Sequence, residues 1–398
     1  MPTVNPQILV WARETAGYDL SEAAKKLTFT HSKSATAEEK LAALESGKEA
    51  PSRPLLLKMS KQYHRPLLTF YLKAPPARAD RGEDFRTLRH AIDPSLNGIV
   101  DALVRNIKAR QEIVREALIS AQDHDPLVFI GSYTLGQGVQ GLVNLIRARV
   151  SIDLNIYRSK KTQEEAFKYL RDQIEALGIF SLLAGNLGSY HTNLSTDVFR
   201  GFAIADSIAP FVVINDQDAK TAWPVTILHE VAHLWLGATG ISGSLAERQV
   251  EQFCDKVASE LLMPESELRG SFPYETLRDF DSAVDAISQF ANARKVSSSL
   301  VAFRLLSRGA LTQEMFNNLS VYFLERWKAI RERQKQEAKD ISGGPSYYVL
   351  KRLRNGSALI DASERLMRSG ELSTTQAATV LGVRALKLGK LLSQPRAA

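Results

Sequence analysis

The segment HEVAH, residues 229–233, constrains the fold and the chemistry of this chain more than any other feature. On an α-helix, residues four apart lie on the same face, so the imidazoles of His229 and His233 can reach one metal ion. Glu230 follows the first histidine and can approach the same ion from the side. This spacing supplies two zinc ligands and a carboxylate that can activate a water molecule. The segment therefore predicts a helix that carries a metal site.

The residues around this segment favour a buried helix over a surface helix that happens to carry two histidines. Residues 224–237 begin with a proline, which suits a first helical turn, and end with Gly237, which suits a C-cap. Most residues between them are apolar, and unpaired histidines would be costly on such a helix. Just upstream, residues 211–215 (FVVIN) form an apolar run that predicts a strand.

A third ligand is expected, because catalytic zinc usually takes three protein ligands and keeps one position open. Residues 244–263 form the next predicted helix, with an apolar stripe that packs against another element. Glu247 and Glu251 border this stripe, and Asp255 lies one turn beyond Glu251. One glutamate can serve as a ligand while Asp255 orients a histidine through its other ring nitrogen. The spacing alone does not choose between Glu247 and Glu251.

The segment HEVAHLWLG, followed by VEQFCDKVASELLMP, resembles the paired motifs of the ImmA/IrrE family of metallopeptidases. The resemblance covers about residues 152–308. It implies that His229, His233 and Glu251 hold a zinc ion, with manganese or another divalent metal as alternatives. It also implies that Glu230 is the general base and that Asp255 takes the family's Asn/Asp position, in the second shell of the metal.

In this interpretation residues 211–215 are an edge strand that can hold an extended peptide by main-chain hydrogen bonds. The residue that stabilises the oxyanion is not identifiable from the sequence. Tyr190 and His191, in a predicted loop before the strands, are candidates, although a polar loop is the simpler interpretation.

Residues 1–72 show a different pattern, a series of short helices. The predicted helices span residues 5–16, 20–27, 36–44 and 55–63. Their order resembles an XRE-type helix-turn-helix domain, in which residues 36–44 would be the recognition helix. Two features depart from that family: residues 28–35 are longer than a tight turn, and Glu38 and Glu39 would repel phosphate. The basic residues that can still contact a DNA backbone are Arg13, Lys25, Lys26, Lys33, Lys40 and Arg53. DNA binding and protein recognition both remain open for this domain.

The net charge of +7 is unevenly distributed along the 398 residues. Residues 1–80 hold 12 Lys and Arg against 8 Asp and Glu, and residues 324–398 hold 15 against 7. The remaining residues hold 24 against 29, so basic ends flank a mildly acidic centre. Such ends suit nucleic-acid contact, although a solvated basic helix is the simpler account of residues 326–339.

Composition predicts a cytoplasmic protein without a membrane partner. The single cysteine, Cys254, excludes an intramolecular disulfide and is expected to pack in the apolar stripe. No apolar run approaches the length of a transmembrane helix, and the first residues lack a secretory signal pattern. The oligomeric state is not predicted.

The predicted fold class is α+β and mostly helical. The domains run from an all-α helix-turn-helix domain (1–72) through a linker (73–84) and a helical region (85–150) to a zincin-like peptidase domain with a small sheet (151–310) and a helical C-terminal region (311–398). Further strands are predicted at residues 152–156 and 199–205, and further helices at 97–120, 133–149, 162–177, 297–308 and 312–333. Near the C-terminus, a cap at Ser373 and a turn at Gly382 suggest a small helix-turn-helix pair.

Together these patterns predict an intracellular zinc metalloendopeptidase of the gluzincin kind. The family resemblance implies a regulatory protein as substrate, a transcriptional repressor of the helix-turn-helix type. DNA is a second partner if residues 1–72 bind it. Two alternatives stay open: a DNA-binding regulator whose peptidase-like domain senses a metal or ligand, and a toxin–antitoxin or defence component that acts by binding protein.

Overall fold

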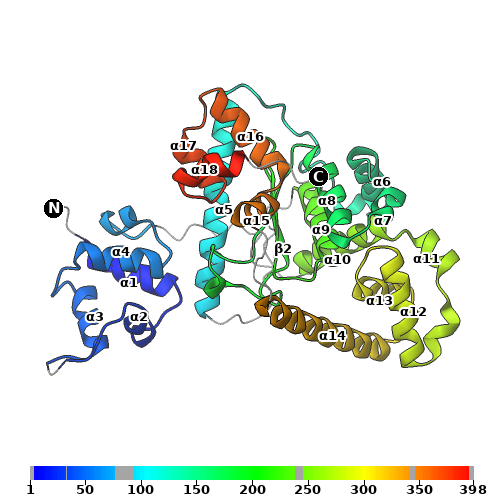
Figure 1. Ribbon diagram of the computed structural model, residues 1–398, viewed down its shortest axis with the longest axis horizontal. Helices are drawn as coiled ribbons and strands as arrows, with labels where there is room; N and C mark the ends of the chain where they lie inside the picture. Colours follow the sequence, from blue (N-terminus) through cyan, green and yellow to red (C-terminus); the bar gives the residue numbers. More distant parts are fainter. Residues whose placement is uncertain (1–3, 33, 77–93, 238–244, 341–345, 394–398) are drawn as a thin grey trace. The chain divides into compact units, whose positions relative to one another are not determined.

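The computed structural model describes residues 4–32, 34–76, 94–237, 245–340 and 346–393. Its contacts divide the chain into two units, the first made of residues 1–109 and 185–199 and the second of residues 110–184 and 200–398. The chain is mostly helical, with one small sheet, as predicted (Figure 1). None of the described helices is long and apolar enough to cross a membrane.

The first unit contains the four helices expected near the N-terminus. They are α1 (Pro6–Thr15), α2 (Leu20–Lys26), α3 (Ala37–Glu45) and α4 (Arg53–Gln62), followed by the 3-10 helix η1 (Leu67–Tyr71). Capping boxes start two of them: Asp19 pairs with Glu22 at α2, and Thr36 pairs with Glu39 at α3. Glu39 is therefore at the helix start because it caps the helix. The apolar faces form one core that includes Ile8, Leu9, Leu41, Met59 and Phe70.

Two of the basic residues offered for DNA contact hold this unit together instead. Arg13 is buried and forms a bidentate ion pair with Glu45, in which Nε and Nη2 lie 2.8 and 3.0 Å from the two carboxylate oxygens. This pair connects α1 to α3. Lys40 donates a hydrogen bond of 2.6 Å to the carbonyl of Thr30 and so closes the loop before α3. That loop, residues 27–36, is longer than the tight turn of a helix-turn-helix. Lys33 lies outside the described residues.

The second unit is built around a three-stranded sheet of order β1-β3-β2. β1 (Phe180–Leu183) runs parallel to β3 (Phe211–Ile214), and β2 (Gly201–Ile204) runs antiparallel to it. The residue pairs Phe180/Phe211 and Gly201/Ile214 set the register. All of β1 and β3 is buried, which fits the continuous apolar sequence of β3 and, apart from Ser181, that of β1. The strands predicted around residues 199–205 and 211–215 are confirmed, whereas β1 was not predicted.

Two predictions about strands were wrong. Residues 152–156 are not a strand, because α7 (Leu154–Ser159) begins there, with the Asp153 carboxylate accepting hydrogen bonds from the first helical N–H groups. β3 is not an edge strand either: it lies in the middle of the sheet, with both sides paired. Among the described strands, β2 and β1 form the edges.

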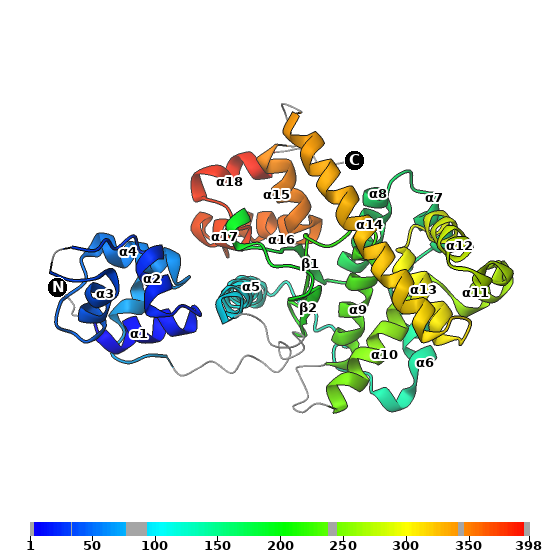
Figure 2. The ribbon, with the colours of Figure 1, turned by 90° about the horizontal axis from the view of Figure 1, so that it is seen from below.

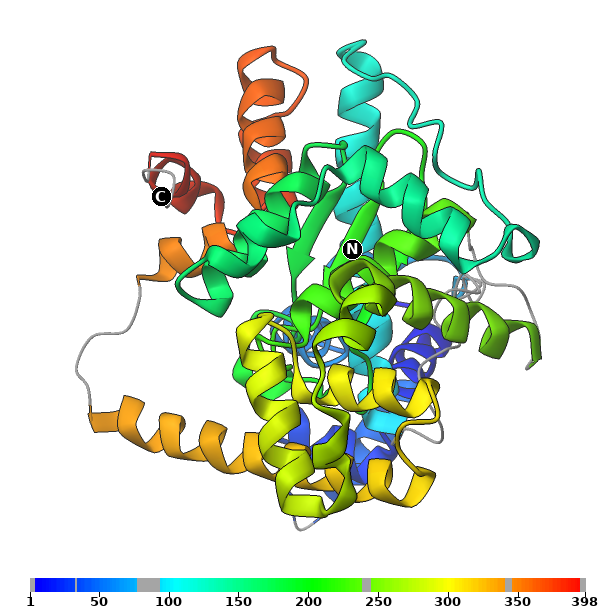
Figure 3. The same ribbon diagram turned by 90° about the vertical axis from the view of Figure 1, so that its right-hand side faces the viewer.

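Helices surround this sheet (Figures 2 and 3). Preceding the sheet are α5 (Pro94–Ser120), of which only the part from residue 110 belongs to this unit, and then α6 (Val139–Val150), α7 and α8 (Gln163–Glu175). Following it are α9 (Trp223–Leu236), α10 (Leu245–Leu262), α11 (Glu265–Ser271), α12 (Phe280–Ala293), α13 (Ser298–Ser307) and α14 (Gln313–Asp340). α9 packs on β2 and β3, and α10 packs on α9 and α6. α14 packs on α12 and α13 at one end and extends beyond them, as Figure 3 shows.

The last four helices form a compact group beside β1. They are α15 (Tyr347–Asn355), α16 (Ser357–Arg368), α17 (Thr374–Val380) and α18 (Ala385–Leu392). The predicted features of the last pair are confirmed: the Ser373 side chain caps α17, and Gly382 has φ +61° between the two helices. Of the predicted linker at residues 73–84, residues 77–84 lie outside the described chain.

A buried carboxylate, Glu175, joins this helical group to the sheet. It pairs with Arg171 at 3.0 Å, and both side chains are almost fully buried. One oxygen of Glu175 also accepts from the Ser181 hydroxyl on β1. The other accepts from the Ser357 hydroxyl at 2.7 Å and from the N–H of Ala358 at 2.9 Å, both at the start of α16. The carboxylate therefore connects α8, β1 and α16.

Replacing this carboxylate is expected to destabilise the second unit strongly. Glu175→Ala leaves the Arg171 guanidinium buried without a counter-charge, which costs about 3–5 kcal/mol. Glu164→Ala, on the same helix, is the matched control, because its ion pair with Lys220 is about half exposed and contributes about 0–1 kcal/mol. Denaturant unfolding of both variants measures the difference. Equal losses of unfolding free energy would contradict this role of Glu175.

Candidate metal centre

α9 carries the HEVAH segment through the middle of the second unit. Pro224 lies in its first turn, and Gly237 ends it in the left-handed conformation with φ +57°, as the sequence predicts. The helix is buried nearly all round, and Trp235 stacks on Phe129 with ring centroids 4.2 Å apart. Such a helix is held rigidly, so the side chains that it turns toward α10 are fixed in position.

α10 packs along α9 through the predicted apolar stripe. The buried residues of this stripe are Val250, Phe253, Cys254, Val257, Ala258 and Leu261. Cys254 belongs to the stripe, as expected, and burial raises the pKa of its thiol well above the usual value. Thiolate chemistry is therefore disfavoured at this position. The polar edge of the helix brings Glu251 and Asp255 to the histidines of α9.

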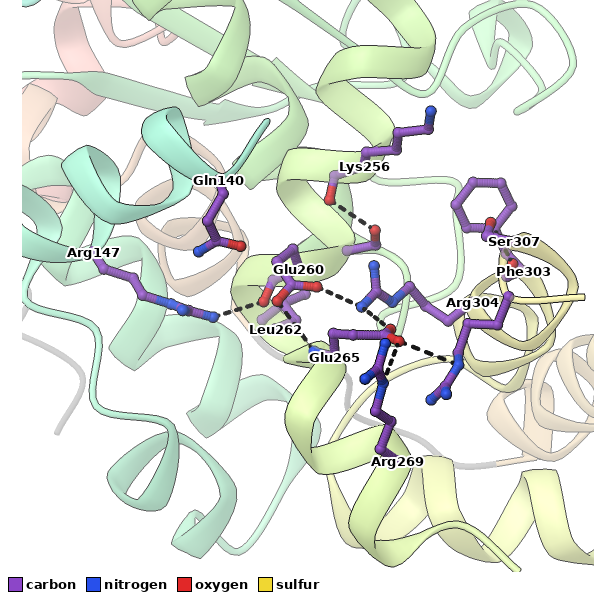
Figure 4. A network of polar contacts seen from close by, with 12 residues as sticks. Gln140, Arg147, Lys256, Glu260, Leu262, Glu265, Arg269, Phe303, Arg304 and Ser307 are labelled. Atoms are coloured by element: carbon purple, nitrogen blue, oxygen red, sulfur yellow. Dashed lines mark hydrogen bonds and ion pairs between the residues drawn. The ribbon is translucent and has the colours of Figure 1, made fainter. Parts of the chain in front are cut away.

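A polar network fixes the far end of α10 (Figure 4). Arg304 on α13 pairs with Glu260 of α10 and, at 3.2 Å, with Glu265 of α11. Arg147 on α6 donates to the carbonyl of Glu260 at 2.8 Å. The N–H of Glu265 donates to the Glu260 carboxylate at 3.1 Å, across Pro264. These contacts hold α10 against three neighbouring helices, which limits rotation of the helix that presents Glu251.

His229, His233 and Glu251 converge on one point between α9 and α10. The two Nε2 atoms are 3.0 Å apart. Glu251 places Oε2 3.3 Å from Nε2 of His229, and Oε1 3.2 Å from Nε2 of His233. These three residues form a group whose ligand atoms lie within 4.8 Å of one another. The side chain of Glu247 lies outside the described residues, so the geometry places Glu251 but says nothing of Glu247.

The donor set fits a zinc-like ion. Two ligands on a tetrahedral zinc ion, with bonds of about 2.0–2.1 Å, are separated by ~3.3 Å. The three observed separations, 3.0, 3.3 and 3.2 Å, lie close to that value. Two imidazoles and one carboxylate are also the ligand types that suit zinc, whereas manganese prefers oxygen ligands to the two nitrogens. Three protein ligands would leave one coordination position for water or substrate.

Asp255 orients one of the histidines. Its Oδ1 lies 2.9 Å from Nδ1 of His229, so Nδ1 donates its proton to this carboxylate and Nε2 is the ring nitrogen that faces His233 and Glu251. Burial would lower the pKa of His229, but hydrogen bonds to Asp255 and Glu251 outweigh it and raise the pKa well above its usual value. Burial opposes the charge on Glu251 too, yet its hydrogen bonds from His229 and His233 hold its pKa well below the usual range.

Glu230 lies beside this group and is buried, with 6% of its surface exposed. Burial raises the pKa of its carboxyl to about 7, against the opposing effect of the neighbouring His229 and His233. A carboxyl group with a pKa near neutrality is suited to accept and return a proton at physiological pH.

Gly201, at the start of β2, makes room for this carboxylate. A Cβ atom at Gly201 would lie 2.7 Å from Oε1 of Glu230, 2.7 Å from Cγ2 of Thr226 and 3.0 Å from the carbonyl oxygen of Val213. Sequence reasoning missed this residue, because a glycine at the start of a strand has many explanations. Its importance depends on the approach of β2 to α9, which only the tertiary structure reveals.

The two candidates for stabilising an oxyanion belong to the other unit. Tyr190 and His191 lie in the 3-10 helix η4 (Tyr190–Thr192), within residues 185–199. The side chain of Tyr190 is outside the described residues. Neither residue gains support as part of the site.

Comparison with known proteins gives one match. Residues 184–306, about a third of the chain, match the Peptidase_M78 family model, described as the IrrE N-terminal-like domain. This stretch contains α9, α10 and all five residues of the candidate centre, and it supports a metallopeptidase-like domain of the ImmA/IrrE kind. Neither the curated proteins nor the solved structures gave a match.

Asp255 is expected to strengthen metal binding without being a ligand. Asp255→Asn keeps the size of the side chain but removes the charge that holds the Nδ1 proton of His229, which should weaken zinc binding about 10–100-fold. Asp285→Asn, on the exposed face of α12, is the matched control and should leave the affinity unchanged. Competition with a chromophoric chelator measures both. An unchanged affinity in Asp255→Asn would remove this role.

Proposed function

We propose that this chain is a metal-dependent endopeptidase. The observation that carries the proposal is the convergence of His229, His233 and Glu251, with the buried carboxyl group of Glu230 beside them. The family match over residues 184–306 supports the same class. A zinc ion held by these three residues would lower the pKa of water and polarise a peptide carbonyl.

The remaining chemistry belongs to Glu230. A carboxylate at this position accepts the proton of the attacking water and then returns it to the leaving amine. Burial raises the pKa of this carboxyl group above its usual value, which favours a group that takes up a proton readily. Gly201 preserves the space in which the carboxylate lies.

We propose that β2, and not β3, holds the substrate backbone. β2 is an edge of the sheet, and Gly201, at its start, lies directly against Glu230. The N–H of Asn215 donates to the carbonyl of Arg200, so alternation along the antiparallel pair turns the backbone groups of Gly201 and Ala203 away from β3. An extended peptide added to that edge would run past the Glu230 carboxylate.

The substrate that we propose is a regulatory protein, a transcriptional repressor of the helix-turn-helix type, and the proposed location is the cytoplasm. Residues 1–72 would serve as an XRE-like recognition module for this protein. Arg13 and Lys40 are engaged in internal contacts, and Glu38 and Glu39 stand at the start of α3, so this module is poorly equipped to bind phosphate. Protein recognition is therefore favoured over DNA binding at this end of the chain.

Glu230→Gln tests the proposed chemistry. The amide keeps the size and hydrogen bonding of the side chain but cannot accept a proton. Zinc content should be unchanged, and cleavage should fall by about 10²–10⁴-fold. The assay compares new N-termini in a lysate of the source organism treated with the parent protein or the variant. Undiminished cleavage by Glu230→Gln would exclude the mechanism.

Gly201→Ala provides a second, independent variant. Its methyl group should displace the Glu230 carboxylate without touching the metal ligands. We expect full zinc content and cleavage reduced at least ~10-fold, because a displacement of about 1 Å can cost 10²-fold. Loss of zinc from this variant would show that β2 positions the ligands and not the base.

Deleting residues 1–72 tests the recognition module. If the module captures the substrate, the truncated protein should need a several-fold higher concentration of repressor for half-maximal cleavage. The cleavage rate of a short peptide spanning the same bond should stay the same, because the metal centre is in the second unit. An equal effect on repressor and peptide would argue against recognition by this module.

A further inference from the structure

The C-terminal helices α17 and α18 form a tight two-helix unit with the features of a DNA-reading element. Residues 381–384 connect them, and Gly382 provides the left-handed conformation in this turn, with φ +61°. A turn of three or four residues that contains glycine is the usual connection in a helix-turn-helix. Figures 1 and 2 show the pair packed together with α15 and α16.

The buried positions of the pair explain its rigidity. The side chains that close the core between the two helices are Ala377, Ala378, Val380, Leu381, Leu388 and Leu391. α15 fastens the pair from the side: Lys351 donates to the carbonyl of Gly382 at 2.9 Å, and Arg352 donates to the carbonyl of Leu391 at 3.1 Å. The face of α18 that carries Leu388 and Leu391 packs in the core, so its opposite face is exposed to solvent.

That outer face is basic and lacks carboxylates. Arg384, Lys387 and Lys390 are exposed, and the chain contains no Asp or Glu from residue 372 to its end. Lys387 lies 4.7 Å from the ring centroid of Tyr347, which is itself 43% exposed. A cluster of cations on an exposed helix and at its N-cap, where Arg384 lies, is the electrostatic signature of contact with phosphates.

The same face presents an apolar side chain where a reading helix would contact bases. Leu386, in the first turn of α18, is 98% exposed, the highest value among the large apolar side chains described as exposed. Leaving leucine fully in water is unfavourable, whereas contact with a thymine methyl group in the major groove would bury it. Gly389, one turn later, has open space around its Cα, so nothing on that side would prevent close approach to a groove.

We propose that α17 and α18 bind double-stranded DNA, with α18 as the helix that enters the major groove. Arg384, Lys387 and Lys390 contact phosphates, and Leu386 contacts base edges. This function is independent of the proposed peptidase chemistry, because no residue of the metal centre takes part. It also assigns nucleic-acid binding to the C-terminal end of the chain, whereas in the first unit the connection before α3 spans residues 27–36 and two of the cations are used internally.

The first test compares two charge-matched variants of the full-length protein by fluorescence anisotropy with a labelled DNA duplex of mixed sequence. Arg384→Ala/Lys387→Ala/Lys390→Ala should weaken binding on the order of 100-fold at 0.1 M salt and lower the salt slope by about 2–3, because each lost phosphate contact contributes ~0.9. Lys25→Ala/Lys26→Ala/Arg53→Ala removes three exposed charges from the first unit and should bind as the parent does.

Either of two results would overturn the proposal: no binding by the parent protein at low salt, or a greater loss in the variant of the first unit. The variant Glu230→Gln should bind DNA like the parent, which separates a failure here from a failure of the peptidase proposal. Equal circular dichroism and zinc content in all variants control for folding.

The second test concerns base reading. Duplexes enriched from a random pool by the parent protein are compared with the mixed duplex. Leu386→Ala should bind the mixed duplex within about twofold of the parent and lose about 10-fold of its preference for the enriched sequences. An unchanged preference would show that Leu386 does not contact base edges and would overturn the assignment of base reading to this side chain.

Discussion

The packing of α10 against α9 is the constraint on which the rest of this structure depends. It brings one carboxylate, that of Glu251, within 3.3 Å of two imidazole nitrogens that are themselves 3.0 Å apart. Three partly buried polar groups at such distances are stable only if they share protons or a cation. The apolar stripe of α10, the network around Glu260 and the burial of α9 all serve to hold this arrangement. The metal centre therefore depends on α9 and α10 each being held at a fixed rotation about its own axis.

The sequence predicted local features well because each depended on nearby residues. Pro224 and Gly237 set the ends of α9, and the apolar period of α10 set its buried face. The helical spacing could not decide whether Glu247 or Glu251 is the third metal ligand, because both border the same apolar stripe. The family resemblance was needed to choose Glu251. The central place of β3 and the clearance at Gly201 depend on tertiary contacts that no local pattern encodes. The helix at residues 154–159 was missed because its apolar residues follow a pattern that is also typical of a strand. The side chain of Asp153 caps the first turn and so favours the helix.

The structure shows that the basic residues at the two ends of the chain are used differently. In the first unit, a share of the positive charge is used internally, as the Arg13–Glu45 pair shows. Near the C-terminus the cations of α18 project into solvent beside an exposed leucine. Both ends of the chain are therefore basic, but part of the positive charge of the first unit is used in internal contacts, whereas the cations at α18 are exposed to solvent. A chain with these parts would join recognition, metal-dependent cleavage and DNA contact in one molecule, as the proposals above describe.

X-ray absorption spectroscopy of the zinc-loaded protein tests the central claim most directly. If His229, His233 and Glu251 hold the metal, the spectrum should show one zinc ion per chain with two imidazole nitrogens at about 2.0–2.1 Å and oxygen ligands at about 2.0–2.2 Å. Replacing His233 by alanine should remove one imidazole contribution or the metal itself. A sulfur ligand at about 2.3 Å, which would implicate Cys254, or the absence of stoichiometric zinc binding, would contradict the account.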